Sequence, residues 1–268
     1  MVIEELQVKK QNGPYSLPYE LSASPVQLFL PPPNGTSTPQ ISVIMPALNE
    51  EKAIGPLLDR TQQTLQQMHL TYEIIVIDDG SRDQTLDICR GKCVTIIHNR
   101  YNCGKGYALR EGFKHARGEI ILTIDTDGDH HPEEIPLLLA PLLDGKVDAV
   151  LGSRFITNGS KPVTSAVNSF GNKFFNFVVR GLTNHNFTDT QCGFRAFKKF
   201  CLSILSLETF GYDLETETVV KLARRDIPYC EVPVTSPVSS IRKSNLIWIK
   251  DGLRILFTIL KTRLKKSI

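Results

Sequence analysis

The stretch Ile120-Ile121-Leu122-Thr123-Ile124-Asp125-Thr126-Asp127-Gly128-Asp129-His130 decides the fold and points to the chemistry. Its first half is apolar and mostly β-branched, which predicts a buried strand. Carboxylates then occupy alternate positions where that strand must end. Hard oxygen ligands of this kind suit Mg²⁺ or Mn²⁺, and open α/β sheets bind ligands at the carboxyl ends of their strands. The stretch therefore predicts a divalent metal site at a strand end.

Other interpretations of this acidic stretch fit less well. An EF-hand loop counted from Asp125 would need Gly at its sixth position and Glu at its twelfth, where this chain has His130 and Pro136. A phosphatase of the haloacid dehalogenase type also carries Asp-x-Asp-Gly after a strand, usually near the start of its domain and followed by Thr. Here Asp129 follows, and further motifs precede it. A solvated acidic turn without a ligand is the remaining alternative.

Composition is that of an ordinary soluble globular protein, with 268 residues of which 41% are hydrophobic and 22% charged. One large domain can bury a full core at this length. The first residues lack the basic and apolar regions of a signal peptide, so we expect a cytosolic location. The six cysteines show neither a Cys-x-x-Cys pair nor His at zinc spacing, which favours reduced thiols over a metal site.

Charge is unevenly distributed along the chain. Residues 239–268 hold eight Lys+Arg and one acidic residue, net +7, which leaves residues 1–238 at 23 minus 27, or −4. The segment also has an apolar helical face with Trp248 and a basic face, typical of a helix in the interface of an anionic membrane. Its uncharged runs are too short to span a bilayer. A helix that closes over its own domain is the alternative; general nucleic-acid binding is not expected.

Strands and helices alternate after a proline-rich extension, residues 1–39, in which we expect no regular structure. The alternation predicts an α/β fold with a mostly parallel central sheet flanked by helices. We expect strands at Ile41–Met45, Glu73–Ile77, Val94–Ile97, Ile120–Ile124, Ala149–Gly152 and Glu231–Val234. We expect helices around Ile54–Met68, Gln84–Arg90, Tyr107–Ala116, Pro132–Leu143, Asn168–Arg180 and Leu214–Ala223.

Unusual residues occupy the loops that follow these strands. In order they are Pro46-Ala47-Leu48-Asn49-Glu50, Asp78-Asp79-Gly80-Ser81-Arg82-Asp83, Gly104-Lys105-Gly106, Asp125-Thr126-Asp127, Gly152-Ser153-Arg154 and Cys192-Gly193-Phe194-Arg195. From about Ile41 to Val234 the chain resembles family 2 glycosyltransferases with the GT-A (Rossmann-like) fold. The last two motifs make it more similar to their dolichol-phosphate mannosyltransferase branch. Each motif is weak alone, and their order and spacing together are specific.

The resemblance implies a nucleotide-sugar site in the first loops. It assigns Pro46, Asn49, Glu50, Asp78 and Asp79 to the base and ribose, because carboxylates can accept hydrogen bonds from ring N–H groups. Leu48 stands where an aromatic residue is common. As an alternative, Asp79 or Ser81 caps the following helix. Lys105, between two glycines at a helix start, suits contact with the diphosphate, unless it is only part of a turn.

The resemblance also implies a mechanism. A divalent ion held by Asp127 and Asp129 would neutralise the departing diphosphate, with Asp125 turned toward the ribose or supporting a metal ligand. Arg154 would bind the acceptor phosphate in fork geometry; alternatively, it pairs with a neighbouring carboxylate. Asp213 and Glu215 are candidate bases if the acceptor is an alcohol, and otherwise favourable charges at a helix start.

Just before the basic helix, the family places basic residues near the mouth of the site, which implies that Arg242, Lys243 and Ser244 meet a lipid phosphate. We therefore expect a GT-A domain at residues 40–238 and an amphipathic C-terminal helix at 239–268, peripheral on the cytosolic face of a membrane. The expected reaction is metal-dependent, inverting transfer of a hexose from GDP-mannose or a UDP-hexose to polyprenyl or dolichyl phosphate. One alternative is transfer to a glycan or other alcohol. Another is a catalytically silent, membrane-docked subunit with a possible partner subunit in the membrane.

Overall fold

The computed structural model describes residues 27–29, 38–156, 176–181 and 183–235. Three predicted features lie outside these residues: the amphipathic helix with Arg242, Lys243 and Ser244, most of the extension 1–39, and the first part of the helix expected around Asn168–Arg180. Residues 176–181 of that helix are described and are helical.

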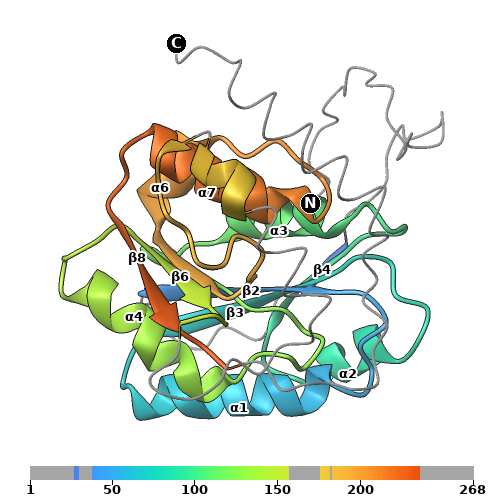
Figure 1. The fold of residues 1–268 in the computed structure, drawn as a ribbon. Coiled ribbons are helices and arrows are strands. Elements are labelled where there is room, and N and C mark those ends of the chain that lie inside the picture. Colours follow the sequence, from blue (N-terminus) through green and yellow to red (C-terminus); the bar gives the residue numbers. More distant parts are fainter. Residues whose placement is uncertain (1–26, 30–37, 157–175, 182, 236–268) are drawn as a thin grey trace.

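One eight-stranded sheet forms the centre of the described part of the chain (Figure 1). From one edge to the other its strands are β1 (Gln27–Phe29), β4 (Thr95–His98), β3 (Tyr72–Asp78), β2 (Ile41–Ala47), β5 (Ile120–Thr123), β7 (Arg195–Lys198), β6 (Ala149–Ser153) and β8 (Tyr229–Pro233). Neighbours from β4 to β5 run parallel, as do β6 and β8. The carboxyl ends of β4, β3, β2 and β5 therefore meet at one edge, where the predicted loops begin.

Two strands run against this direction, and neither was expected. β7 is antiparallel to both β5 and β6, and β1 is antiparallel to β4. The expectation of no regular structure before residue 40 was wrong at β1, where backbone pairing with β4 holds three residues that have no strand pattern of their own. The expected α/β class with a mostly parallel sheet is confirmed.

Helices cover both faces of the sheet (Figure 1). On one face lie α1 (Ile54–Gln67), α2 (Thr85–Arg90) and α4 (Ile135–Leu143), which a 3₁₀ turn at Pro132–Glu134 precedes. On the other lie α3 (Lys105–His115), α6 (Lys199–Leu205) and α7 (Asp213–Arg224). All except α6 were expected, with bounds shifted by a few residues.

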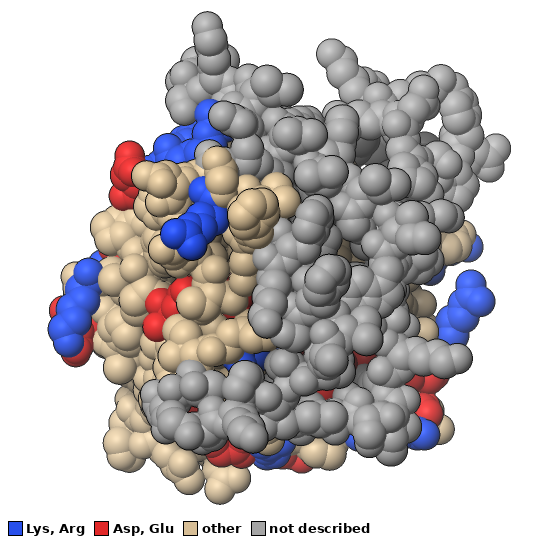
Figure 2. Space-filling model, viewed as in Figure 1, with Lys and Arg blue, Asp and Glu red and all other residues tan. Residues whose placement is uncertain are grey.

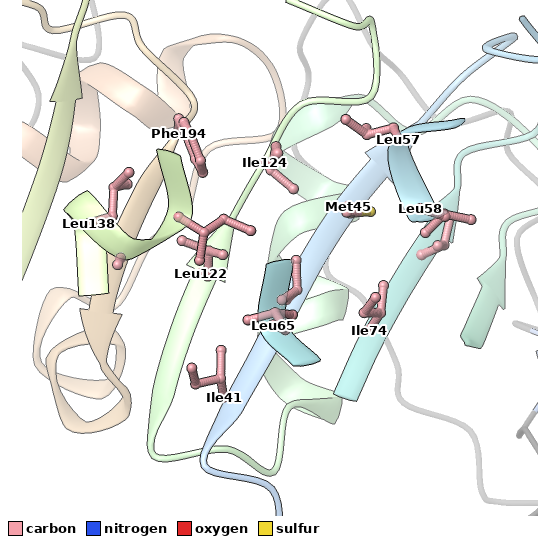
Figure 3. Packing of buried hydrophobic residues seen from close by; sticks show 14 of the residues in the cluster. Ile41, Met45, Leu57, Leu58, Leu65, Ile74, Leu122, Ile124, Leu138 and Phe194 are labelled. Atoms are coloured by element: carbon pink, nitrogen blue, oxygen red, sulfur yellow. The ribbon is translucent and has the colours of Figure 1, made fainter. Parts of the chain in front are cut away.

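Strand β2 shows why two helical layers are needed. All seven of its residues are buried, and successive side chains point to opposite faces of the sheet. Val43 and Met45 join the cluster that contains Leu57 and Leu58 of α1, while Ile44 joins the cluster that contains Ala108 of α3. Figure 3 shows Met45 and Leu122 of the sheet facing the α1 and α4 side chains. Each fully buried side chain of this kind contributes about 1.5–3 kcal/mol.

The surface of the described part of the chain carries positive and negative side chains. On the face in Figure 2, Lys and Arg side chains are interspersed with Asp and Glu on the visible described surface. None of the helices in the described ranges has the length and apolar character needed to cross a bilayer.

Candidate active site

Loops after β2 and β3 are joined by backbone-to-side-chain hydrogen bonds. Asn49 has a positive φ of 56°, its N–H donates to Ser81 Oγ (2.9 Å), and its Oδ1 accepts from the N–H of Arg82 (2.8 Å). Glu50 N–H donates to Thr85 Oγ1 (2.7 Å). The backbone N–H and the side-chain oxygen of Asn49 thus hold the loop after β2 against the loop after β3. The contact of Asn49 with a nucleotide stays a prediction.

Asp78, the last residue of β3, is fully buried and bonded within the protein. Its Oδ1 accepts from Ser81 N–H (3.1 Å), and its Oδ2 lies 2.7 Å from Nδ1 of His98. His98 ends the neighbouring strand β4 and stands opposite Asp78 in the sheet register. The carboxylate therefore ties two strand ends together at the edge where we predicted the nucleobase.

Asp79 holds the loop between β4 and α3. Its Oδ1 accepts from the side-chain amide of Asn99 (2.8 Å) and from Cys103 N–H (2.9 Å), and its Oδ2 accepts from Gly104 N–H (2.8 Å). Burial raises the pKa of Asp79 above its usual value, although these hydrogen bonds oppose the shift. Asp79 thus binds backbone at the start of α3 rather than capping α2, the helix that follows it in sequence.

Lys105, the first residue of α3, lies between two carboxylates. Its Nζ is 2.8 Å from Asp125 Oδ1 and 2.6 Å from Glu215 Oε1, and only 14% of its side chain is exposed. Burial lowers the pKa of Lys105, but the two carboxylates raise it by more, so it stays well above the ordinary lysine value. Burial raises the pKa of Asp125, but the ammonium of Lys105 and the imidazole of His130 lower it by more, so it lies far below its usual range. The predicted contact of Lys105 with a diphosphate is untested, and its charge is already compensated inside the protein.

Close packing of backbone brings these three charges together. The Gly106 position has no room for a side chain, since a Cβ there would lie 2.7 Å from the carbonyl carbon of Phe210. Tyr107 N–H donates to the oxygen of the same carbonyl (3.1 Å). The start of α3 is thereby pressed against the segment that leads into α7, whose first turn contains Glu215. The glycines of the Gly-Lys-Gly motif thus allow the backbone of α3 to lie close to the backbone at Phe210.

Asp127 and Asp129 follow β5 at the edge of the sheet and are half-buried. Gly128 between them has a φ of 84°, and Asp129 N–H donates to Asp127 Oδ1 (3.0 Å). Thr126 Oγ1 donates to the carbonyl of Pro46 in β2 (2.7 Å), which fixes the loop to the neighbouring strand. The positive φ of Gly128 turns the backbone sharply between the two carboxylates.

A divalent ion suits this pair of carboxylates in part. Among the described residues no set of three or more His, Cys, Asp or Glu side chains is arranged to hold a metal. Asp127 and Asp129 offer two hard oxygen groups at a strand end, and Mg²⁺ commonly takes one or two carboxylates together with phosphate oxygens. The residues fit an ion that is completed by a bound diphosphate.

His130 is buried directly behind the acidic turn. Its Nε2 lies 3.6 Å from Asp125 Oδ2 and its ring packs on Phe194, with centroids 5.1 Å apart. Its Nδ1 finds no hydrogen-bond partner in the part of the chain that the structure describes. His130 is thus a buried loop residue that contacts Asp125 from inside the protein.

Arg154 follows β6 and forms a fork with Asp189. Its Nε donates to Asp189 Oδ2 (2.7 Å) and its Nη2 to Asp189 Oδ1 (3.0 Å), and its N–H also reaches Oδ2 (3.2 Å). The carboxylate of Asp189 is fully buried, and a quarter of the Arg154 side chain is exposed. This is the carboxylate pair that we gave as the alternative; the phosphate contact of Arg154 stays a prediction. Asp189 was missed because a single acidic residue gives no local signal.

Arg195, the last residue of the Cys192-Gly193-Phe194-Arg195 motif, is a buried cation. Its guanidinium donates to three backbone carbonyls, those of Cys192 (2.7 Å), Glu215 (2.8 Å) and Thr190 (2.9 Å). Burial lowers the pKa of Arg195 from its ordinary value. Arg195 thereby joins the segment before β7 to the first turn of α7. Only the tertiary structure reveals this, because the acceptors are backbone atoms.

Known proteins share this fold. A structure of glucosyl-3-phosphoglycerate synthase from Mycobacterium tuberculosis, in complex with Mn²⁺, uridine diphosphate and phosphoglyceric acid, superimposes with a TM-score of 0.66 at 22% identity, covering 85% of this chain and 80% of that one. At that identity the likeness supports the fold alone, and it confirms the expected GT-A architecture.

Sequence relatives extend the comparison. The UDP-N-acetylglucosamine–dolichyl-phosphate N-acetylglucosaminyltransferase of Methanococcus voltae is 29% identical over 255 residues, which are 85% of this chain and 98% of that protein. The dolichyl-phosphate β-glucosyltransferase of Homo sapiens is 30% identical over 253 residues, 84% of this chain and 76% of that protein. The model of glycosyl transferase family 2 matches residues 42–203, more than half of the chain. The protein is therefore a glycosyltransferase of family 2.

Proposed function

We propose that the protein transfers a hexose from a nucleoside diphosphate-sugar to a polyprenyl phosphate, with inversion at the sugar carbon. The observation that carries this proposal is the pair Asp127 and Asp129 at the end of β5, next to the carboxyl end of β2, which β3 flanks on its other side. The names of the two sequence relatives add the acceptor class, since both act on dolichyl phosphate. Inversion rests on the family resemblance.

On the donor side, Asp127 and Asp129 would hold Mg²⁺ or Mn²⁺, and the loops that contain Pro46, Glu50 and Asp79 would surround the nucleoside. The ion, when bound, supplies positive charge that stabilises the departing nucleoside diphosphate. The mycobacterial synthase, which has a similar fold, was crystallised with Mn²⁺ and uridine diphosphate. Two hydrogen bonds hold the loop that contains these carboxylates. The N–H of Asp129 donates to the Asp127 carboxylate, and the hydroxyl of Thr126 donates to the carbonyl of Pro46 in β2.

On the acceptor side, Glu215 argues for a phosphate rather than an alcohol. An alcohol needs a general base, whereas a phosphate is already ionised at neutral pH and needs cations that bind it. The carboxylate of Glu215 is 4% exposed and lies 2.6 Å from the ammonium of Lys105, so it is paired with a cation inside the protein. Arg154, held by Asp189 with part of its side chain exposed, is the cation that we assign to the acceptor phosphate.

Peripheral attachment to the cytosolic face of a membrane is also part of the proposal, and it rests on the sequence of residues 239–268. Their net charge of +7 suits an anionic surface, with Arg242, Lys243 and Ser244 next to the lipid phosphate. Removing residues 246–268 should release the protein from anionic vesicles and slow transfer to a long polyprenyl phosphate more than to a short soluble analogue. Unchanged vesicle binding after truncation would contradict this attachment.

A panel assay tests the reaction. The protein with Mn²⁺ is incubated with UDP- and GDP-hexoses, and nucleoside diphosphate release is followed with polyprenyl phosphate, with the matching polyprenol, or with no acceptor. We expect release that depends on the phosphate of the lipid. Stimulation by the alcohol alone would favour the alternative acceptor class. Absence of release with every donor and acceptor would favour a catalytically silent subunit.

A further inference from the structure

We infer that Tyr101 is the residue on which the nucleobase of the donor stacks. This inference rests on the proposed function and deepens it, because it names how the nucleoside is held. Two negative findings prompt it: Leu48 is not aromatic, and the carboxylates of Asp78 and Asp79 are bonded within the protein. An aromatic surface on which the base can stack must therefore come from a residue other than these three.

Tyr101 lies where the base is expected. Gly80, two residues after the end of β3, has a φ of 80°, and a Cβ at this position would lie 2.7 Å from the carbonyl carbon of Tyr101 and 3.0 Å from its Cα. The backbone of Tyr101 is thus packed directly on the turn that follows β3. Ligands of open α/β sheets bind beyond the carboxyl ends of such strands.

The loop that carries Tyr101 is held in place before any ligand binds. Asp79 accepts three hydrogen bonds from residues on either side of Tyr101, namely from Asn99, Cys103 and Gly104 at 2.8–2.9 Å. Asn102 Oδ1 also accepts from Gly104 N–H (3.0 Å). A residue in a loop fixed in this way loses little conformational entropy when a ligand binds, which favours affinity.

The side chain of Tyr101 is accessible to a ligand. The residue is 53% exposed, although it lies between the buried Asn99 and the anchored Cys103. The guanidinium carbon of Arg100 lies 5.5 Å from the ring centroid, within the range of a cation–π contact that covers one face. A base can stack on the opposite face. Stacking tolerates any base, since every base has a π-face.

Binding measurements separate this role from a structural one. Calorimetry with Mn²⁺ and either UDP or GDP should show an affinity about tenfold lower for Tyr101→Ala than for the wild-type protein, because base–aromatic stacking is lost. Tyr101→Phe keeps the ring and should bind within about twofold of wild type. Inorganic pyrophosphate, which has no base, should bind all three proteins equally. Phe200→Ala, at a 49% exposed aromatic residue of α6, is the matched control and should bind as wild type.

The outcomes distinguish this inference from the proposed function. If the wild-type protein binds a nucleoside diphosphate and Tyr101→Ala binds it equally well, the inference is overturned while the function stands. An equal loss of pyrophosphate affinity in Tyr101→Ala would also overturn it, because the effect would then not come from the base. If the wild-type protein binds neither UDP nor GDP with Mn²⁺, the proposed function fails and the inference fails with it.

Discussion

Lys105 Nζ lies 2.6 Å from Glu215 Oε1, and the same ammonium lies 2.8 Å from Asp125 Oδ1. The three residues belong to α3, to the loop after β5 and to α7, so a single buried cation connects three elements from distant parts of the chain. Two carboxylates around one lysine leave the cluster with a net negative charge. Loss of the cation would therefore leave two largely buried anions facing each other, so we expect Lys105 to stabilise the ligand-free fold.

Replacing Lys105 with Met should destabilise the ligand-free protein by about 3–5 kcal/mol, the usual effect of removing one partner of a buried ion pair. Urea unfolding measures the change. Lys146→Met is the control, since its 71% exposed side chain pairs with the 54% exposed side chain of Asp144 and its loss should leave the stability nearly unchanged. Unchanged stability together with a lost affinity for nucleoside diphosphate would return Lys105 to the phosphate contact expected from the sequence.

Gly106→Ala should destabilise the protein by about 1–3 kcal/mol, because the new Cβ meets the backbone at Phe210 and packing must shift. Thermal and urea unfolding both report this loss. Gly181→Ala is the matched control, as nothing lies within 4 Å of its added Cβ. A Gly106→Ala protein as stable as wild type would show that α3 and the segment before α7 leave room for a side chain at this position.

Glu133 should titrate well below an ordinary glutamate. Its hydrogen bonds with Arg60, at 2.8 and 2.6 Å, lower its pKa to about 2. Since the unfolded value is about 4.3, the pair stabilises the fold above that pH, and this contribution disappears as the pH falls toward 2. With 57% of the Glu133 side chain exposed, the effect on stability should stay under about 1 kcal/mol. NMR titration of the carboxyl carbon measures the pKa, and a value near 4.3 would contradict the pairing.

Arg154→Lys should slow transfer to polyprenyl phosphate without weakening the binding of nucleoside diphosphate. Lysine keeps the charge but cannot form the two parallel bonds to Asp189 that orient the side chain. We expect at least a tenfold fall in kcat/KM for the lipid acceptor, about 1.4 kcal/mol of lost transition-state stabilisation. An unchanged rate with the lipid would remove Arg154 from the acceptor site.

Sequence patterns predicted the fold where they were long and periodic. Strands such as β2 and β3 are seven-residue runs buried on both faces, and the amphipathic α1 has an apolar stripe. By contrast, β7 has four residues and begins with the buried Arg195, which reads as polar in the sequence. β1 has three residues that only pairing with β4 defines. Short strands defined by tertiary partners give no local signal.

Site motifs were found at the positions that the structure brings to one sheet edge, but their contacts could not be read from the sequence. The alternative that Asp79 caps α2 was wrong, because its carboxylate accepts from backbone N–H groups at the start of α3. Its assignment to a nucleotide stays a prediction. Lys105 was expected to face a phosphate, and its partners Asp125 and Glu215 lie 20 and 110 positions further along the chain. Which charges meet in the interior depends on packing between elements, and motif spacing does not encode it.

Metal-dependent transfer of a hexose to a lipid phosphate can be followed directly with a labelled donor. Labelled hexose is followed from its nucleoside diphosphate into the lipid phase with polyprenyl phosphate and Mn²⁺, for wild type, Asp127→Asn and the exposed-site control Asp144→Asn. We expect a labelled polyprenyl phosphate-hexose with wild type and with the control. With Asp127→Asn the rate of transfer should fall at least a hundredfold, which corresponds to about 2.7 kcal/mol in activation free energy. Near-normal transfer by Asp127→Asn, or no lipid product from the wild-type protein with any UDP- or GDP-hexose, would contradict it.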